Sequence, residues 1–188
     1  MPVAVSRRLF TVDQYHKMAR SGILSEDDRV ELLAGEIVDM SPIGSRHAAC
    51  VKCLNQIFNE SLQGQAVVSV QDPIRLGPRS EPQPDLALLK PRADFYANAH
   101  PGPQDVLLII EVVETSAEVD RKLKLPLYAK AGIPEVWIFE LSAKKVEVYR
   151  NPSARKYLVS ETYTKKQTLS LQAYPHVNVD LSEVFRII

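Results

Sequence analysis

The chain has 188 residues, of which 45% are hydrophobic and 24% are charged, a composition typical of a globular domain. Lysine and arginine total 23, as do aspartate and glutamate, so the formal net charge is zero. This balance excludes polybasic binding, which depends on a large positive excess, but it leaves room for a local basic groove. The length predicts one domain over residues 1–188.

Signals for a membrane or a secreted location are missing from the sequence. No apolar run approaches the roughly 20 residues needed to cross a bilayer, because the longest, over residues 106–110, stops at Glu111. The N-terminus lacks the order of charge, apolar core and cleavage site of a secretory signal. Cys50 and Cys53 are too few for a disulfide scaffold, and their place in an amphipathic segment favours buried thiols. We therefore expect a cytoplasmic protein with no membrane partner.

The predicted elements begin with a helix after Thr11, which stands at capping-box spacing from Gln14. A hairpin is expected over residues 29–40, and apolar residues at helical spacing predict a second helix over residues 46–63. Strands are then predicted over residues 66–70, 85–89 and 106–113, with a proline-rich loop over residues 90–104 before the last of them.

A third helix is predicted over residues 116–131, with Thr115 and Glu118 as its capping box and Gly132 as its left-handed terminator. Pro126 inside this helix removes one backbone hydrogen bond, which costs about 3 kcal/mol unless the helix kinks. Further strands are expected over residues 134–139, 145–149, 156–164 and 168–171. This order predicts an α/β fold in which helices cover both faces of a mixed β-sheet.

Two acidic residues stand in unusually apolar surroundings. Asp85 opens the predicted strand 85–89, and Glu111 interrupts the most apolar run of the chain. A buried carboxylate is costly unless a cation neutralises it, and pairing with a lysine or arginine is the commoner solution. If the two strands lie side by side, however, the two acids form an oxygen-rich site suited to Mg²⁺ or Mn²⁺. Histidine-rich zinc chemistry is not expected, because the four histidines are scattered at positions 16, 47, 100 and 176.

The predicted third helix can bring a cation to this site. At about 100° per residue, Asp120, Lys124 and Tyr128 share one edge of the helix, which can carry the lysine toward the two acids. The spacing alone favours the alternative, a surface Asp–Lys pair worth about 0.3–0.5 kcal/mol. His47, near the start of the second helix, can contact a phosphate, although capping or structural packing is the commoner role.

Several segments taken together resemble a known family. They are Pro84-Asp85, Ile110-Glu111-Val112, the stretch DRKLKLPLYAKAGIPEVWI over residues 120–138, and VELLAGEIVDMSP over residues 30–42 followed by His47. This combination resembles a bacterial family of small restriction endonucleases in the PD-(D/E)XK nuclease superfamily. The resemblance implies a restriction-endonuclease-like core that binds Mg²⁺ or Mn²⁺ and hydrolyses phosphodiester bonds in DNA.

The resemblance also implies roles for single residues. Asp85 and Glu111 match the acids that bind the metal, with the backbone carbonyl of Val112 as a further ligand. The superfamily lysine would stand two residues after the second acid, where this chain has Val113, and Lys124 matches its place on the next helix. These matches make Asp85, Glu111 and Lys124 the predicted catalytic residues.

Two further acids complete the comparison with the family. Glu31 matches an additional acidic position that assists the metal site or orients Lys124, and it is included among the predicted catalytic residues. Glu114 departs from the family pattern, since a small residue such as serine is expected there. Its extra negative charge can act on the metal, bind a second ion or have no effect.

Other functions remain open at this level. A catalytically inactive module with the same fold, binding nucleic acid or a protein partner, is mildly favoured by the zero net charge. The combination of Asp85, Glu111 and Lys124 argues against it, because a binding module has no use for a carboxylate in so apolar a strand. A metal-dependent hydrolase of a smaller phosphate ester is a third possibility. The resemblance further suggests a homodimer, since nucleases of this type often cut two strands with two subunits.

Overall fold

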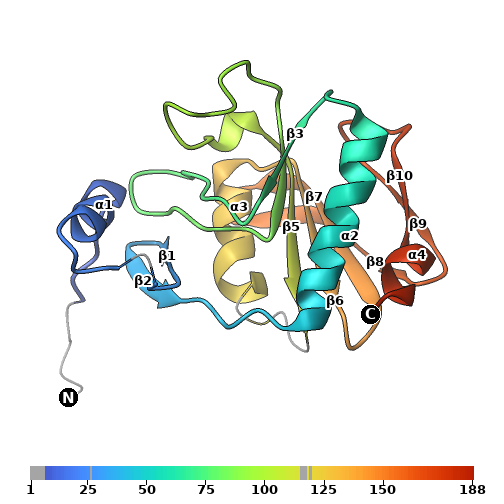
Figure 1. Ribbon diagram of the computed structural model, residues 1–188, viewed down its shortest axis with the longest axis horizontal. Helices are drawn as coiled ribbons and strands as arrows, with labels where there is room; N and C mark the ends of the chain where they lie inside the picture. Colours follow the sequence, from blue (N-terminus) through green and yellow to red (C-terminus); the bar gives the residue numbers. More distant parts are fainter. Residues whose placement is uncertain (1–6, 26, 115–117, 119) are drawn as a thin grey trace.

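The computed structural model describes residues 7–25, 27–114, 118 and 120–188, and a mixed β-sheet lies at its centre (Figure 1). The sheet has six strands in the order β3-β4-β5-β6-β7-β8. β5 and β6 run parallel, and all other neighbouring pairs run antiparallel. The strands are β3 (Val67–Val70), β4 (Leu86–Leu89), β5 (Val106–Val113), β6 (Glu135–Glu140), β7 (Lys145–Ser153) and β8 (Lys156–Thr164).

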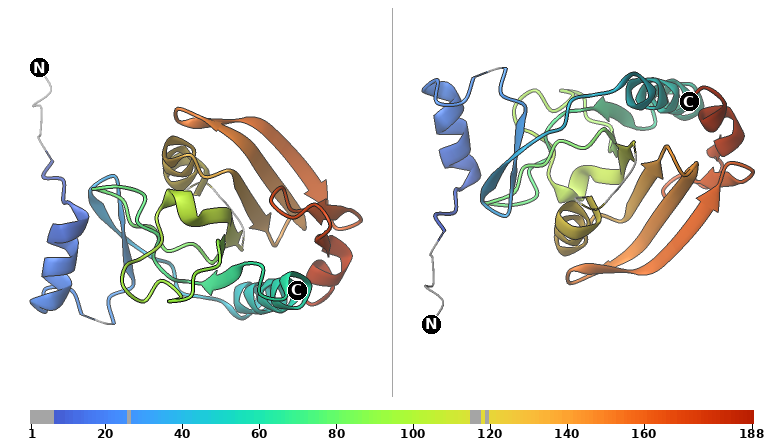
Figure 2. Two further views of the ribbon diagram at one scale, coloured as in Figure 1. Left: turned by 90° about the horizontal axis from the view of Figure 1, so that it is seen from above. Right: turned by 90° about the horizontal axis from the view of Figure 1, so that it is seen from below.

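Helices cover both faces of this sheet (Figure 2). They are α2 (Ser45–Leu62) and α4 (Leu181–Arg186) on one face, and α3 (Leu125–Ala131) on the other. Because successive strand residues point to opposite faces, Leu108 and Ile110 of β5 pack in the core beneath α2, whereas Ile109 packs with Tyr128 of α3. The predicted fold class, a mixed sheet with helices on both faces, is confirmed.

The N-terminal elements lie together on one side of the molecule, away from α4 (Figure 1). α1 (Val12–Arg20) begins at the predicted capping box, in which Gln14 N–H donates to Thr11 Oγ1 and Thr11 N–H donates to Gln14 Oε1. The predicted hairpin is formed by β1 (Val30–Leu33) and β2 (Glu36–Asp39). The hydrogen bond from Glu81 N–H to Leu32 O, at 2.8 Å, fastens this hairpin to the segment that leads into β4.

The third helix differs from its prediction in a way that matters for the site. A π-helical turn over Asp120–Lys124 leads directly into α3, which ends at Gly132 in the left-handed conformation, as predicted. Pro126 is the second residue of α3 and directly follows the π-helical turn, so the predicted α-helix changes its winding where the proline stands. Thr115, the predicted capping residue, lies outside the described residues. Single π-helical turns are frequent at functional sites, where they re-aim side chains.

The C-terminal segment also departs from the prediction. The predicted strand 168–171 appears as β9 (Thr168–Ser170), which pairs with β10 (Asn178–Asp180) in a separate two-stranded sheet. Neither β10 nor α4 is apparent from the sequence, because segments of three to six residues are too short to show a periodic pattern. The predicted loop before β5 contains a short 3-10 turn, Pro103–Asp105. Among the described helices, none is long and apolar enough to cross a bilayer.

Candidate active site

Asp85 and Glu111 lie at the same edge of the sheet because β4 and β5 are antiparallel neighbours. Leu86 pairs with Ile110, so the residue before β4 and the residue after Ile110 lie at the same end of the two strands. Val112 N–H donates to Asp85 Oδ2 at 2.8 Å, which ties the aspartate to β5. The expectation that these two strands lie side by side is therefore confirmed.

The other oxygen of Asp85 has two side-chain neighbours. Asp85 Oδ1 lies 3.0 Å from His47 Nε2 and 3.4 Å from Gln71 Nε2. His47 stands in the first turn of α2, but Gly44 is the N-cap, so His47 contacts the aspartate and does not cap the helix. His47 Nδ1 is buried and has no hydrogen-bond partner among the described residues. Asp85 is thus held from three directions while 14% of its side chain remains exposed.

Lys124 is surrounded by three carboxylates. Its Nζ lies 3.2 Å from Glu31 Oε1, 3.3 Å from Glu111 Oε1 and 3.8 Å from Asp120 Oδ1. Tyr128 OH donates to the same Glu111 Oε1 at 2.5 Å. Asp120, Lys124 and Tyr128 share one edge, as the spacing predicts, and that edge faces the strand ends. The alternative of a surface ion pair is wrong, because Lys124 is only 6% exposed.

The lysine is held in turn by the N-terminal hairpin. Glu31 of β1 is 4% exposed, and Gln83 N–H donates to its Oε2 at 3.0 Å, which leaves Oε1 directed at Lys124. The carboxylate therefore connects the lysine to the segment that carries Asp85. This geometry matches the second of the two roles expected for Glu31, the orientation of Lys124.

Burial changes the acidity of the groups in this cluster. It raises the pKa of Glu111 well above its usual value, against the opposing effect of Lys124. Burial likewise raises the pKa of Asp120. It lowers the pKa of Lys124, but Glu111, Glu31 and Asp120 outweigh this and raise the pKa above its usual value. One permanent cation thus faces three carboxylates, so the cluster must take up protons or bind a further cation to balance its charge.

These groups line an open cleft of about 610 Å³. Its walls come from the strand ends, the hairpin, the π-helical turn and the segment between the hairpin and α2. Glu114 also lines the cleft, where it pairs with Arg46 of α2 (Nη1 to Oε1, 2.5 Å). Both side chains of this pair are 44% exposed. The charge that departs from the family pattern is therefore neutralised at the rim.

Comparison with known proteins identifies the family. The model of the Uma2 family, described as "Putative restriction endonuclease", matches residues 12–182. The chain belongs to the Uma2 family. A solved structure, described as a putative nuclease belonging to DUF820 from Anabaena variabilis ATCC 29413, superposes with a TM-score of 0.72 at 17% identity, covering 94% of this chain and 98% of that chain. The Uma2 fold is thus shared with that structure, whereas no curated protein matches the chain.

Sequence reasoning misses part of the surroundings of this Uma2 site. The contacts of His47 and Gln71 with Asp85 join segments that share no strand or helix pattern, so no local periodicity reveals them. The hydrogen bond from Tyr128 to Glu111 extends the edge that the helical spacing identifies.

Proposed function

We propose that this chain is a divalent-metal-dependent endonuclease that hydrolyses phosphodiester bonds in DNA. The observation that carries the proposal is the excess of buried carboxylates over cations around Lys124, in an open cleft beside Asp85. Proton uptake or a bound cation balances such an excess, and a divalent ion is the cation that suits carboxylate ligands. Membership of a family described as restriction endonucleases supports phosphodiesters as the substrate class.

The residues at the strand ends fit Mg²⁺ or Mn²⁺. Asp85 and Glu111, with the carbonyl of Val112, would hold the ion, since these hard cations prefer oxygen ligands. Mg²⁺ is usually bound by one or two carboxylates together with water, so a closed cage of protein ligands is not required. When bound, the ion neutralises the scissile phosphate and lowers the pKa of a coordinated water. His47 and Gln71 keep Asp85 in place as positioning residues.

Lys124 supplies the remaining positive charge in this mechanism. Its raised pKa keeps the ammonium group protonated at neutral pH, so it can stabilise the negative charge that grows on the phosphate oxygens. Glu31 fixes the position of Lys124, and Tyr128 fixes the carboxylate of Glu111. The homodimer and the cytoplasmic location stay predictions of the sequence.

Nicking of supercoiled plasmid DNA in Mg²⁺ or Mn²⁺ tests the proposal. Asp85→Asn and Lys124→Met are each expected to lower the rate by at least about 100-fold, the effect of removing one charge-stabilising group, with unchanged circular dichroism. Asp72→Asn and Lys130→Met, which alter exposed residues near the same elements, serve as matched controls with wild-type rates. Equal nicking by wild type and by both site variants contradicts the proposal.

Two further measurements separate the alternatives. If the chain is an inactive binding module, titration calorimetry with Mn²⁺ gives the same heat for wild type and Asp85→Asn. If the substrate is a smaller phosphate ester, a chromogenic phosphodiester is hydrolysed while plasmid DNA stays intact.

A further inference from the structure

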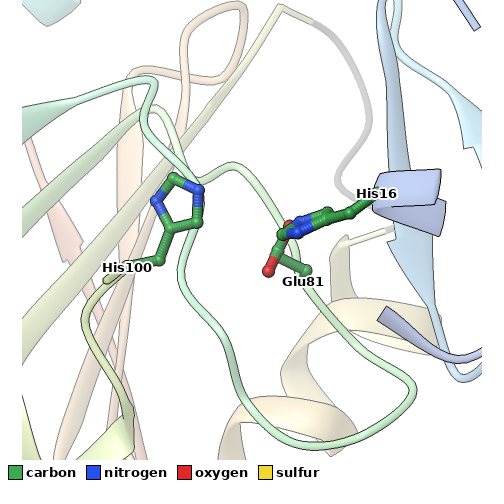
Figure 3. Close-up of side chains that lie close together, drawn as sticks. All are labelled: His16, Glu81 and His100. Atoms are coloured by element: carbon green, nitrogen blue, oxygen red, sulfur yellow. The ribbon is translucent and has the colours of Figure 1, made fainter. Parts of the chain in front are cut away.

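Side chains from three separate segments meet outside the cleft (Figure 3). They are His16 of α1, Glu81 from the segment before β4, and His100 from the loop before β5. One possible ligand atom of each residue lies within 4.8 Å of the other two. His16 Nε2 is 2.6 Å from Glu81 Oε1. The imidazole rings of His16 and His100 lie edge to face, with their centroids 6.2 Å apart. The expectation that the histidines are too scattered to meet is wrong for this pair, because the fold brings the two loops and α1 together.

Glu81 provides a second, independent observation. The residue is 3% exposed, and its Oε2 is buried without a hydrogen-bond partner in the part of the chain that the structure describes. The hydrogen bond from Glu81 N–H to Leu32 O fixes the backbone of Glu81 against β1. An unpaired buried carboxylate oxygen is strongly unfavourable, and a bound cation removes that penalty.

We propose that His16, Glu81 and His100 together bind one divalent transition-metal ion, with Zn²⁺ as the best fit. Two imidazole nitrogens and one carboxylate oxygen suit Zn²⁺, whereas Mg²⁺ and Ca²⁺ take oxygen ligands. Three protein ligands leave a fourth position for water, and the exposed His100 and the 33% exposed side chain of His16 leave that position accessible. Zn–ligand distances of about 2.0–2.1 Å place tetrahedral donors about 3.3 Å apart. The ion would therefore replace the 2.6 Å contact between His16 Nε2 and Glu81 Oε1, whose atoms would move apart, while rotation of the exposed His100 side chain brings its ring nitrogen closer.

The ion would add a direct link between three segments of the chain. It links α1 and the loop 90–104 to the segment that carries Glu81, Gln83 and Asp85. Because this site differs from the acidic cleft in its ligands and its location, it does not depend on the proposed nuclease function. Its consequence is a stabilisation of the folded chain that grows with zinc concentration.

Zinc binding to the full chain tests the proposal, and it is best measured in the Asp85→Asn variant, which removes the metal ligand proposed for the acidic cleft. Equilibrium dialysis is expected to give one Zn²⁺ per chain, and Co²⁺ in its place should give the visible absorption of a four-coordinate site with nitrogen ligands. His16→Ala and His100→Ala are expected to weaken zinc binding by at least about 100-fold, consistent with the loss of one direct ligand. His176→Ala, which removes an exposed histidine elsewhere, is the matched control and should bind normally.

Thermal unfolding gives a second readout. In the Asp85→Asn background, a hundredfold excess of Zn²⁺ over its Kd is expected to raise the Tm by about 5–10 °C, with or without His176→Ala, but not when Glu81→Gln is added. Glu81→Gln keeps the shape of the side chain, so its Tm without zinc should be unchanged. An unchanged Tm without zinc shows that the variant is folded and that the missing shift reflects loss of the ion. Zinc binding that persists in both His16→Ala and His100→Ala overturns the proposal. So does binding that disappears in Asp85→Asn alone, since the ion then belongs to the acidic cleft.

Discussion

Glu111 and Glu135 stand on neighbouring parallel strands and are both almost completely buried, yet their carboxylates are satisfied in opposite ways. Glu135 Oε1 accepts from Trp137 Nε1 at 2.9 Å and from Arg150 Nε at 2.8 Å. Its Oε2 accepts from Gln172 N–H at 2.8 Å. Arg150 lies opposite Glu135 on β7, and the other carboxylate beside it, Glu161 at 3.7 Å, is half exposed to solvent. Glu135 is therefore the one buried carboxylate that this arginine neutralises among the described residues, and both of its oxygens accept hydrogen bonds.

Glu111 has no cation to itself. It shares Lys124 with Glu31 and Asp120, and its other short contact is with the hydroxyl of Tyr128. Burial alone therefore does not distinguish a functional carboxylate from a structural one in this sheet. The number of cations per buried carboxylate does, since Arg150 neutralises one buried carboxylate, whereas Lys124 faces three that are at most 13% exposed.

Removal of the cation from each cluster should give the largest contrast. Lys124→Met is expected to lower metal-dependent nicking per folded molecule by about 10²–10³-fold, in addition to the loss of stability from leaving three carboxylates without their cation. Arg150→Met is expected to leave nicking per folded molecule within about threefold of wild type, while the free energy of unfolding falls by about 3–5 kcal/mol because Glu135 is left buried without its cation. Plasmid nicking and urea unfolding of both variants measure the two effects. A stable, inactive Arg150→Met protein contradicts the structural role of Glu135.

Neutralising Glu135 and neutralising Glu111 should change the free energy of unfolding by different amounts. Glu135→Gln is expected to lower the free energy of unfolding by about 2–4 kcal/mol, because it weakens charge-assisted hydrogen bonds in a closed network. Glu111→Gln is expected to change it by less than about 1 kcal/mol or to increase it, since it relieves an excess of negative charge. Urea unfolding without divalent metal measures both, and an equal loss in the two variants removes the distinction.

The pH should act on the unbalanced cluster in a defined direction. The pKa of Glu111 is raised in the folded chain, so the folded state binds that proton more tightly than the unfolded state does. Without metal, the contribution of Glu111 to the stability of the folded chain is complete below the pKa that this group has in the unfolded chain. It is lost as the pH rises through the pKa of Glu111 in the folded chain. Metal binding requires loss of the same proton, so Mn²⁺ affinity should rise by up to about tenfold per pH unit below the folded pKa. Calorimetry across pH 5–8 measures this slope, and a flat profile in wild type would show that Glu111 is not a ligand.

The smallest effect is expected at the rim of the cleft. Glu114→Ser restores the residue type expected for the family and frees only Arg46, whose ion pair is exposed and worth about 0–1 kcal/mol. Nicking should change by less than about threefold. A change of tenfold or more would place Glu114 among the residues that act on the metal.

Local patterns predict the elements of this fold well. The capping box at Thr11, the hairpin and the amphipathic α2 follow from periodicity and turn residues, and the apolar runs locate β4 and β5. Asp85 and Glu111 then fall at one end of adjacent strands because both runs are interrupted there. The charge balance is not predictable in this way, because the partner of Glu135 is fixed by the register between β6 and β7. The contacts of His47 with Asp85 and of His16 with Glu81 likewise join segments far apart in the sequence.

The π-helical turn over Asp120–Lys124 has one more consequence. Such a turn winds through more residues than an α-helical one, so it sets the angular position of the side chains before it relative to those after it. The buried Tyr128 and Ala129 fix α3 on the sheet, so deleting a single residue between Asp120 and Lys124 would turn Asp120 by about 100° around the helix axis relative to Lys124. A one-codon deletion could therefore remove one carboxylate from the cleft while leaving the sheet, the helices and every acidic residue of the strands in place.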